Sequence, residues 1–93
     1  MKITFRTFAT FREVIGAGET ALILPPGATV GRLLENLCTA HPGLRAHVFD
    51  GAGQIKPYIL ILKNGRSVMS LQQLDTVINE GDVVALFPPV AGG

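Results

Sequence analysis

One segment in the middle of the chain restricts the possible folds more than any other feature. Apolar residues recur there at the spacing of one face of an α-helix, at Val30, Leu33, Leu34, Leu37 and Cys38. Thr29 can cap this helix through its hydroxyl, and His41-Pro42-Gly43 ends it. Because an apolar face this broad must be covered by another element, the sequence predicts one substantial helix packed on a sheet.

The segment before this helix predicts two strands and a short helix. Lys2–Phe8 alternates in polarity, which is typical of a half-buried strand. Phe8, Phe11 and Ile15 then recur at helical spacing until glycines end the run, and the set is expected to be mainly core, with room for one ring outside. Thr20–Leu24 predicts a second strand, since the prolines that follow cannot continue a ladder.

The segment after the helix predicts three more strands. Tyr58–Leu62 and Val83–Phe87 are apolar without alternation, so both faces of these strands are expected to be covered. Asn64-Gly65 is a hairpin turn signal, after which Arg66-Ser67-Val68 can return as a short edge strand. Leu44–Lys56 is the least regular stretch. In order, the elements are β, short α, β, α, β, β, β, which predicts an α+β roll with helices on one face of the sheet.

Composition excludes several classes of function. The 93 residues suffice for one domain, and the net charge of +1 offers no basic face to nucleic acid. No apolar run approaches the length of a membrane span, and a single cysteine rules out an internal disulfide. We therefore expect a cytoplasmic protein with no nucleic-acid or membrane partner.

The usual catalytic and metal-binding arrangements are not found in the sequence. His41 and His47 lack cysteine or carboxylate partners at ligand spacing, so surface or capping roles are favoured. Cys38 lies on the apolar stripe and is favoured as a small buried hydrophobe over a nucleophile. The remaining candidate acids and bases, Asp50, Asp75 and Asp82, have the spacing of turn or cap residues.

The C-terminal segment is the exception. The last apolar strand runs into Phe87, and Pro88-Pro89 then favours an extended exit that leads the chain away from the body of the domain. The following residues are small or β-branched, and they end in two glycines, which permit close approach of the backbone to another protein. Such a tail can deliver the α-carboxylate of Gly93 to the active site of a partner.

That carboxylate would need activation before it could react. Its ordinary pKa is about 3.5, so it is ionised at neutral pH and is a poor electrophile. A partner that attaches AMP from ATP would supply a leaving group, and a sulfur nucleophile could then displace AMP and leave a thiocarboxylate. This chemistry requires no catalytic side chain from the chain itself.

Two segments resemble the MoaD/ThiS family of sulfur carriers. Residues 8–16, FATFREVIG, resemble the family's F-A-x-x-R-E-x-x-G segment, and residues 81–93, GDVVALFPPVAGG, resemble the G-D-x-V-A-x-x-P-P-V-x-G-G ending of MoaD, the small subunit of molybdopterin synthase. The resemblance implies a β-grasp, ubiquitin-like domain over residues 1–87, with a mixed five-stranded sheet on one main helix. Residues 88–93 would form a flexible, extended C-terminal tail.

The resemblance also implies roles for individual residues. Gly93 would be the acceptor for adenylation and thiocarboxylate formation, with Gly92 as its permissive neighbour. The arm that enters the partner would consist of Pro88, Pro89, Val90 and Ala91. Phe87 and Phe8 match apolar positions that the family presents to partners, and Val68 is a weaker candidate on the adjacent edge.

Several partners and pathways are compatible with the resemblance. It implies a ubiquitin-activating-type adenylating enzyme that uses ATP, no tightly bound cofactor, and the large subunit of molybdopterin synthase or another sulfur-accepting enzyme. The connection at Leu44–Lys56 is longer than in the shortest family members, which leaves the pathway open to cysteine, thiamin or tRNA thiolation. The sequence is also compatible with a ubiquitin-like protein modifier and with a plain ubiquitin-like binding module.

Overall fold

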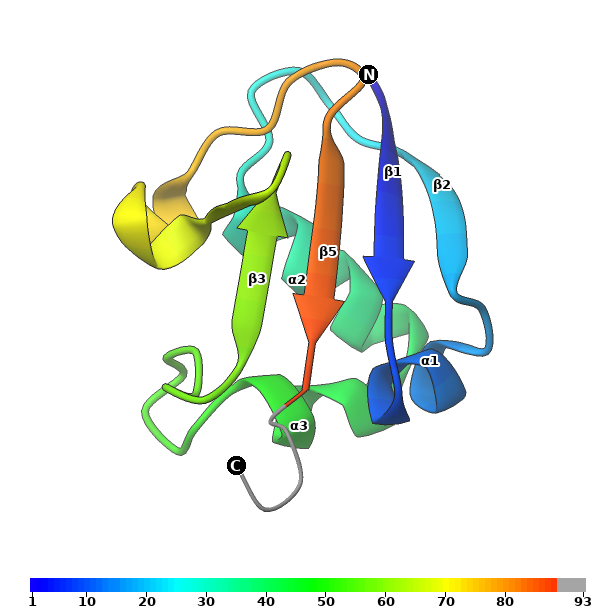
Figure 1. Cartoon of the computed structure of the whole chain (residues 1–93), viewed down its shortest axis with the longest axis vertical. Coiled ribbons are helices and arrows are strands. Elements are labelled where there is room, and N and C mark those ends of the chain that lie inside the picture. Colours follow the sequence, from blue (N-terminus) through cyan, green and yellow to red (C-terminus); the bar gives the residue numbers. More distant parts are fainter. Residues whose placement is uncertain (89–93) are drawn as a thin grey trace.

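The computed structural model describes residues 1–88, and its central feature is a five-stranded mixed sheet with the main helix packed on one face (Figure 1). The strands are β1 (Lys2–Thr7), β2 (Glu19–Ile23), β3 (Leu60–Lys63), β4 (Arg66–Ser67) and β5 (Val83–Phe87). The α-helices are α1 (Thr10–Ile15), α2 (Val30–Ala40) and α3 (Arg45–Val48), and 3-10 helices cover Pro42–Leu44, Val68–Ser70 and Gln73–Asp75.

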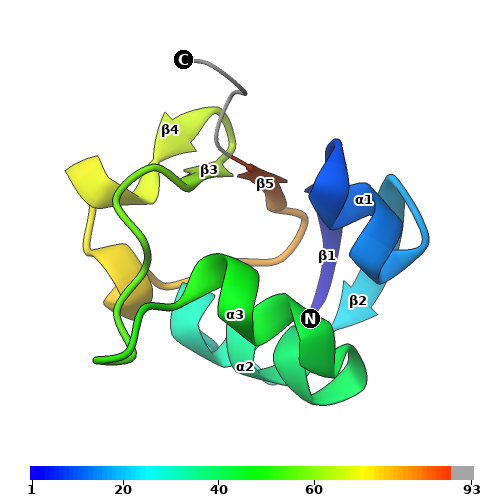
Figure 2. The same ribbon diagram turned by 90° about the horizontal axis from the view of Figure 1, so that it is seen from below.

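The sheet has the strand order β2-β1-β5-β3-β4, with the first and last strands of the chain side by side in its middle. β1 and β5 run parallel, whereas the β1–β2, β3–β5 and β3–β4 pairs are antiparallel. Seen from below, α2 and α3 lie across one face of the sheet (Figure 2). This arrangement confirms the mixed five-stranded sheet packed on one main helix.

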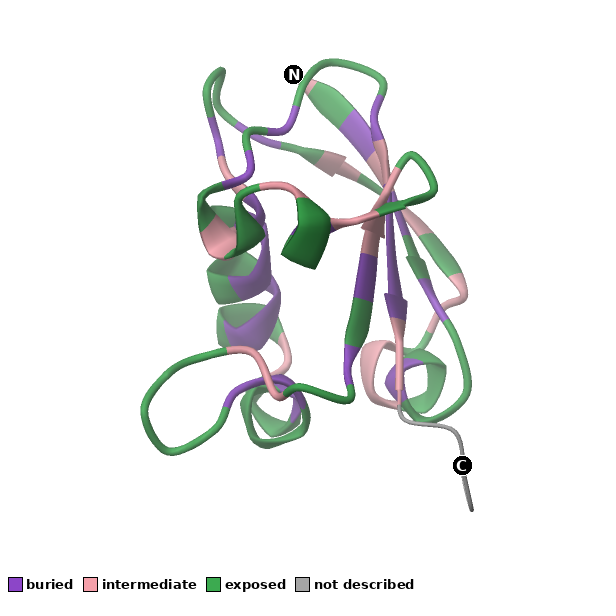
Figure 3. Ribbon diagram, turned by 60° about the vertical axis from the view of Figure 1, so that its left-hand side comes forward, coloured by how far each residue is buried: buried purple, intermediate pink, exposed green. Residues whose placement is uncertain are grey.

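The core lies between α2 and the inward face of the sheet. The predicted stripe of α2 is buried in full, and its buried side is turned toward the strands (Figure 3). The Thr29 hydroxyl accepts a hydrogen bond from the backbone N–H of Arg32 at 3.2 Å, which confirms the predicted cap. From the strands, Ile3, Phe5 and Leu86 face this stripe with no more than 1% of their surface exposed. In residues 1–88 no helix has the length and apolar character to cross a bilayer.

The apolar run before the hairpin differs from its prediction. β3 begins at Leu60 rather than at Tyr58, and both residues are exposed, at 42% and 56%. Alternate positions Ile59 and Ile61 are buried, as in a strand with one face on the core. The expectation that both faces of this strand are covered is therefore wrong, because the outer face of the sheet at β3 has no layer of described residues over it.

The stretch Leu44–Lys56 is more regular than its composition suggests. It contains α3, and Phe49 and Ile55 then form an antiparallel bridge around a turn. The Asp50 carboxylate accepts hydrogen bonds from the backbone N–H groups of Ala52 and Gln54 at 2.8 and 3.1 Å, so its predicted turn role is confirmed. Periodicity could not reveal α3, since four residues are too few to show it.

A buried carboxylate joins the hairpin between β3 and β4 to the start of β5. The carboxylate of Asp82 accepts from the Asn64 side-chain amide at 2.9 Å and from the Asn79 backbone N–H at 2.8 Å, and the Lys63 ammonium lies 3.5 Å away. Burial alone would raise the pKa of Asp82, but the two hydrogen bonds and the charge of Lys63 outweigh it and hold that pKa below its ordinary value. The cluster therefore favours the ionised carboxylate.

We expect the Asp82→Ala variant to lose about 1–2 kcal/mol of its free energy of unfolding at neutral pH, because the partly buried hydrogen bonds from Asn64 and Asn79 are lost. Since the folded state lowers the pKa of Asp82, this contribution is present at neutral pH and is lost as the pH falls below about 4. Urea unfolding at pH 7 and at pH 3 would measure both effects. A difference between variant and wild type that stays the same at both pH values would contradict the assignment.

Candidate docking site at the root of the C-terminal tail

β5 is the middle strand of the sheet, and the predicted tail begins directly after its C-terminal end. Val84 and Leu86 are completely buried and anchor the strand, whereas Phe87 is half-buried on the opposite face. Pairing with β3 ends at Phe87, which lies opposite Leu60. Because proline has no N–H to donate, Pro88 does not extend the ladder. The core thus fixes the point from which the tail starts.

An aromatic pair marks this point. The rings of Phe8 and Phe87 stack with centroids 4.3 Å apart and an interplanar angle of 5°. Phe8 follows β1 and Phe87 ends β5, so the parallel pairing of these strands brings the two rings together. The sequence allowed one ring of the set Phe8, Phe11 and Ile15 to lie outside the core. That ring is Phe8, which is 40% exposed, whereas Phe11 is in the core.

Leu60 extends the apolar surface across the sheet. It pairs in register with Phe87 and is 42% exposed. We call Phe8, Leu60 and Phe87 the tail-root patch. Sequence reasoning missed Leu60 because an apolar run without alternation predicts cover on both faces. Its place opposite Phe87 follows from strand pairing, which the sequence pattern does not show.

A tight turn holds Phe8 in place. The backbone N–H of Phe11 donates to the carbonyl of Phe8 at 3.2 Å, and Ala9 between them has φ 53° and ψ −125°. These angles are close to those of the first central residue of a type II′ turn, a position that usually requires glycine. A Cβ is crowded at these angles, so the backbone at Ala9 is strained. Burial of Phe11 in the core keeps the turn closed.

The Ala9→Gly variant is expected to raise the free energy of unfolding by about 0.5–1 kcal/mol, because relief of the strain exceeds the added entropy of the unfolded chain. Ala46→Gly is the matched control, since Ala46 lies in α3 and the same change there should lower stability. Urea unfolding of both variants measures the two signs. Equal losses in the two variants would show that Ala9 is not strained.

Two cavities lie near these elements, and Cys38 is in the lining of neither. One, of about 320 Å³, lies beside Pro88 and is lined in part by His47 and Lys56. Both side chains are engaged there: the Lys56 ammonium donates to the Ala46 carbonyl at 2.7 Å, and the His47 ring meets the edge of Phe11 at 6.2 Å between centroids.

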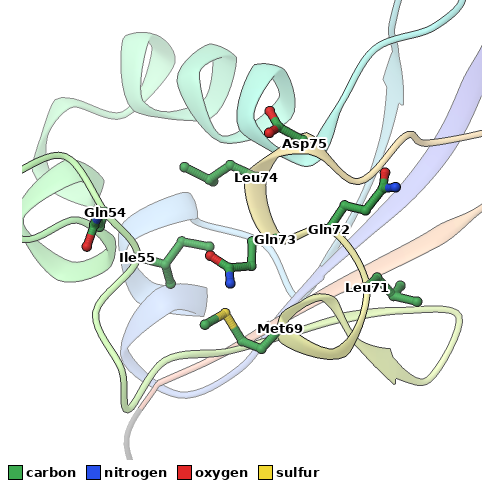
Figure 4. Close-up of a pocket in the computed structure, with 8 residues that line it drawn as sticks. All are labelled: Gln54, Ile55, Met69, Leu71, Gln72, Gln73, Leu74 and Asp75. Atoms are coloured by element: carbon green, nitrogen blue, oxygen red, sulfur yellow. The ribbon is translucent and has the colours of Figure 1, made fainter.

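The second cavity, of about 530 Å³, opens between the segment at Gln54 and Ile55 and the 3-10 helices after β4 (Figure 4). Its lining consists of glutamine and apolar side chains with one aspartate: Gln54, Ile55, Met69, Leu71, Gln72, Gln73, Leu74 and Asp75. It contains no member of the tail-root patch. The cavity is therefore separate from that surface.

The structure also places the other candidate residues. Val68 is completely buried in the 3-10 helix after β4, where the Ser67 hydroxyl accepts from the backbone N–H of Met69 and turns the chain inward. The prediction that Val68 is a surface residue for partners is therefore wrong, and β4 ends before it.

Cys38 is buried as expected. Burial raises the pKa of its thiol, the charge of Arg45 lowers that pKa, and the charge of Glu35 raises it further. His41 caps the end of α2.

The remaining predictions fall partly outside the structure. Pro89, Val90, Ala91, Gly92 and Gly93 lie outside the described residues. Within residues 1–88, no group of three or more His, Cys, Asp or Glu side chains has an arrangement that could hold a metal ion. What the structure brings together is an exposed apolar patch at the position where the last strand leaves the sheet.

Comparison with known proteins identifies the family and supports the fold. The model of the ThiS family matches residues 5–93. The chain is 42% identical to small archaeal modifier protein 3 of Haloferax volcanii and 32% identical to the molybdopterin synthase sulfur carrier subunit of Chlamydomonas reinhardtii, in each case over 93 residues and the full length of both proteins. The crystal structure of SAMP1 from Haloferax volcanii superimposes with a TM-score of 0.87 at 35% identity, covering all of both chains. The chain therefore belongs to the ThiS/MoaD family of ubiquitin-like sulfur carriers and small protein modifiers.

Proposed function

We propose that this protein is a sulfur carrier whose Gly93 α-carboxylate is adenylated by a ubiquitin-activating-type enzyme and then converted to a thiocarboxylate. As the small subunit of molybdopterin synthase, it would donate this sulfur to the precursor of the molybdenum or tungsten cofactor. The observation that supports this best is the family match, which runs through Gly93 and includes a full-length relative named as a molybdopterin synthase sulfur carrier subunit.

The proposed chemistry has two transfers, both catalysed by partners. A carboxylate oxygen of Gly93 attacks the α-phosphorus of ATP, and pyrophosphate leaves. Sulfide delivered by a partner then attacks the acyl carbon, and AMP leaves with the oxygen that joined it to the carbonyl, so that the sulfur stays on Gly93 as a thiocarboxylate. ATP is a substrate of the partner and not a cofactor of this chain, which provides the acceptor group.

The tail-root patch is proposed as the surface that docks on these partners. Phe8 and Leu60 are exposed and Phe87 is half-buried, and strands β3 and β5 and the end of β1 hold the three side chains beside the start of the tail. Apolar and aromatic side chains at the centre of an interface carry much of its binding energy. Docking of this patch would aim the tail into the active site of the partner.

A second function uses the same activated end. The 42% identity to a small archaeal modifier protein favours conjugation, in which a lysine amine of a target attacks the acyl carbon in place of sulfur and forms an isopeptide bond. Carriers for cysteine, thiamin or tRNA thiolation would differ only in the protein that accepts the sulfur. All of these functions use the same activated C-terminal carboxylate, and they differ in the molecule to which the sulfur or the chain is transferred.

The deciding experiment uses the full chain with the adenylating enzyme, ATP and a sulfide source. Intact mass should increase by the difference between sulfur and oxygen, and addition of the large synthase subunit with its pterin precursor should reverse the change. A loaded chain that the synthase does not unload would exclude the molybdopterin role. Covalent adducts on lysines in place of a thiocarboxylate would support the modifier function, and partner binding that survives truncation after Phe87, without any loading, would support a plain binding module.

A further inference from the structure

β2 forms an open edge of the sheet on the side away from β4. It is the first strand in the order β2-β1-β5-β3-β4, and within residues 1–88 it pairs only with β1 (Figure 1). An unpaired edge offers backbone N–H and C=O groups to an added strand. β1 separates this edge from β5, so it is a surface distinct from the tail-root patch.

The register of β1 and β2 shows which groups face outward. Beyond the two ends of the ladder, Leu24 donates its N–H to the carbonyl of Met1 at 2.9 Å, and Thr7 donates to Gly18 at 3.0 Å. Hydrogen-bonded pairs alternate along an antiparallel ladder, so Leu22 and Thr20 also bond to β1. The N–H and C=O groups of the intervening residues Glu19, Ala21 and Ile23 therefore point to the open edge.

An apolar groove lies beside this edge on the helix side. It is about 230 Å³ in volume, between β2 and α2, and its lining is Ile15, Thr20, Leu22, Ile23, Leu24, Asn36, Leu37, Ala40 and His41. No Asp, Glu, Lys or Arg of the described residues lines it. Small-molecule sites usually measure about 300–1,000 Å³, so the volume suits inserted aliphatic side chains better than a free ligand.

We propose that β2 and this groove bind an extended apolar segment of a partner protein, which adds to the sheet as a further strand. The outward groups of Ala21 and Ile23 would bond its backbone, and its alternate side chains would enter the groove over Leu37 and Ala40. Side chains on the other face of the segment would cover Ile23, which is 76% exposed. Because no Asp, Glu, Lys or Arg of the described residues lines the groove, aliphatic residues suit alternate positions of the segment.

A second copy of this chain fits the same edge less well. Twofold antiparallel pairing centred on Ala21 would place Glu19 of each copy opposite Ile23 of the other, because these residues lie equally far from the centre. A carboxylate opposite an aliphatic side chain contributes no favourable pair, and charges on edge strands oppose self-pairing. The observations therefore favour a partner segment without charge.

The test uses the full-length protein and a capped probe peptide of about six residues in which threonine and leucine alternate, the usual length of a strand. Titration followed by amide NMR should shift the signals of Glu19, Ala21 and Ile23 and of the α2 residues that line the groove, and should leave Phe8 and Phe87 unchanged. The same peptide with proline at its centre cannot donate to β2 and should bind weakly.

Two variants and one control make the result specific. Ala40→Glu places a carboxylate in the groove and should weaken peptide binding about tenfold or more. Ala21→Pro removes an outward N–H without loss of a β1 ladder bond and should do the same. Thr39→Glu makes the matching charge change on an exposed residue of α2 that does not line the groove, and it should bind as wild type.

The outcomes divide clearly. Binding lost in Ala40→Glu and Ala21→Pro, kept in Thr39→Glu, with circular dichroism unchanged in all three, supports the proposal. Absence of binding, shifts at the tail-root patch in place of β2, or equal loss in Thr39→Glu would overturn it. Sedimentation that shows a dimer abolished by Ala21→Pro would also overturn it, since a second copy would then be the occupant. None of these measurements depends on sulfur transfer, so failure here is distinct from failure of the proposed function.

Discussion

Deletion of Gly93 is expected to reduce thiocarboxylate formation by at least about 100-fold while leaving the free energy of unfolding unchanged. The shortened chain still ends in a carboxylate, but one residue of extended chain spans about 3.5 Å, and misplacement of a reacting group by about 1 Å already costs this much. The core formed by residues 1–88 ends at Leu86 in β5, and a glycine has no side chain to add to it, so stability should not depend on the last residue. Intact mass after incubation with the adenylating enzyme, ATP and sulfide measures the loss.

Gly93→Ala is the matched control for reach. It keeps the carboxylate at the same chain length and adds only a Cβ, so it should lose less activity than the deletion and distinguish reach from backbone freedom. Loading of the deleted chain at the wild-type rate would mean that the terminal carboxylate of Gly93 is not the acceptor.

Leu60→Asp is expected to weaken binding to the adenylating enzyme by about 2–4 kcal/mol, because docking would bury an unpaired carboxylate in the tail-root patch. Leu60 lies opposite Phe87 in the sheet and is 42% exposed, so the unbound protein should tolerate the charge. Isothermal calorimetry with the full chain and the enzyme gives the affinity.

Val77→Asp is the matched control for this variant. Val77 is also an exposed aliphatic residue, at 44%, but it forms a bridge with Thr29 and belongs neither to the tail-root patch nor to the β2 edge. It should bind the adenylating enzyme as wild type does. Equal losses for the two variants would show that the effect arises from charge alone and that Leu60 does not dock.

Much of the fold could be predicted because hydrophobic periodicity follows burial directly. The stripe on α2 and the alternation in β1 each identify a buried face, and both are present as expected. The run at β3 misleads because an exposed apolar face has the same composition as a buried one. Val68 departs from its predicted place because the Ser67 hydroxyl ends β4 and turns the chain, which hairpin signals do not indicate.

The candidate site was only partly accessible to sequence reasoning for a related reason. Phe8 and Phe11 have helical spacing, and the sequence between them contains no glycine that would predict a turn. Ala9 nevertheless adopts a conformation that usually requires glycine. This turn, and not a helix face, directs Phe8 outward. Leu60 joins the patch through pairing of β3 with β5, a contact between distant segments that local patterns do not encode.

The parallel pairing of β1 with β5 has a consequence for biosynthesis. Val83–Phe87 must leave the ribosome before the middle of the sheet can close, since its central strand comes last in the order of translation. A nascent chain that lacks β5 cannot form the stack of Phe8 on Phe87. An activating enzyme that binds this stack would therefore engage chains in which β5 is in place and pass over chains that lack it.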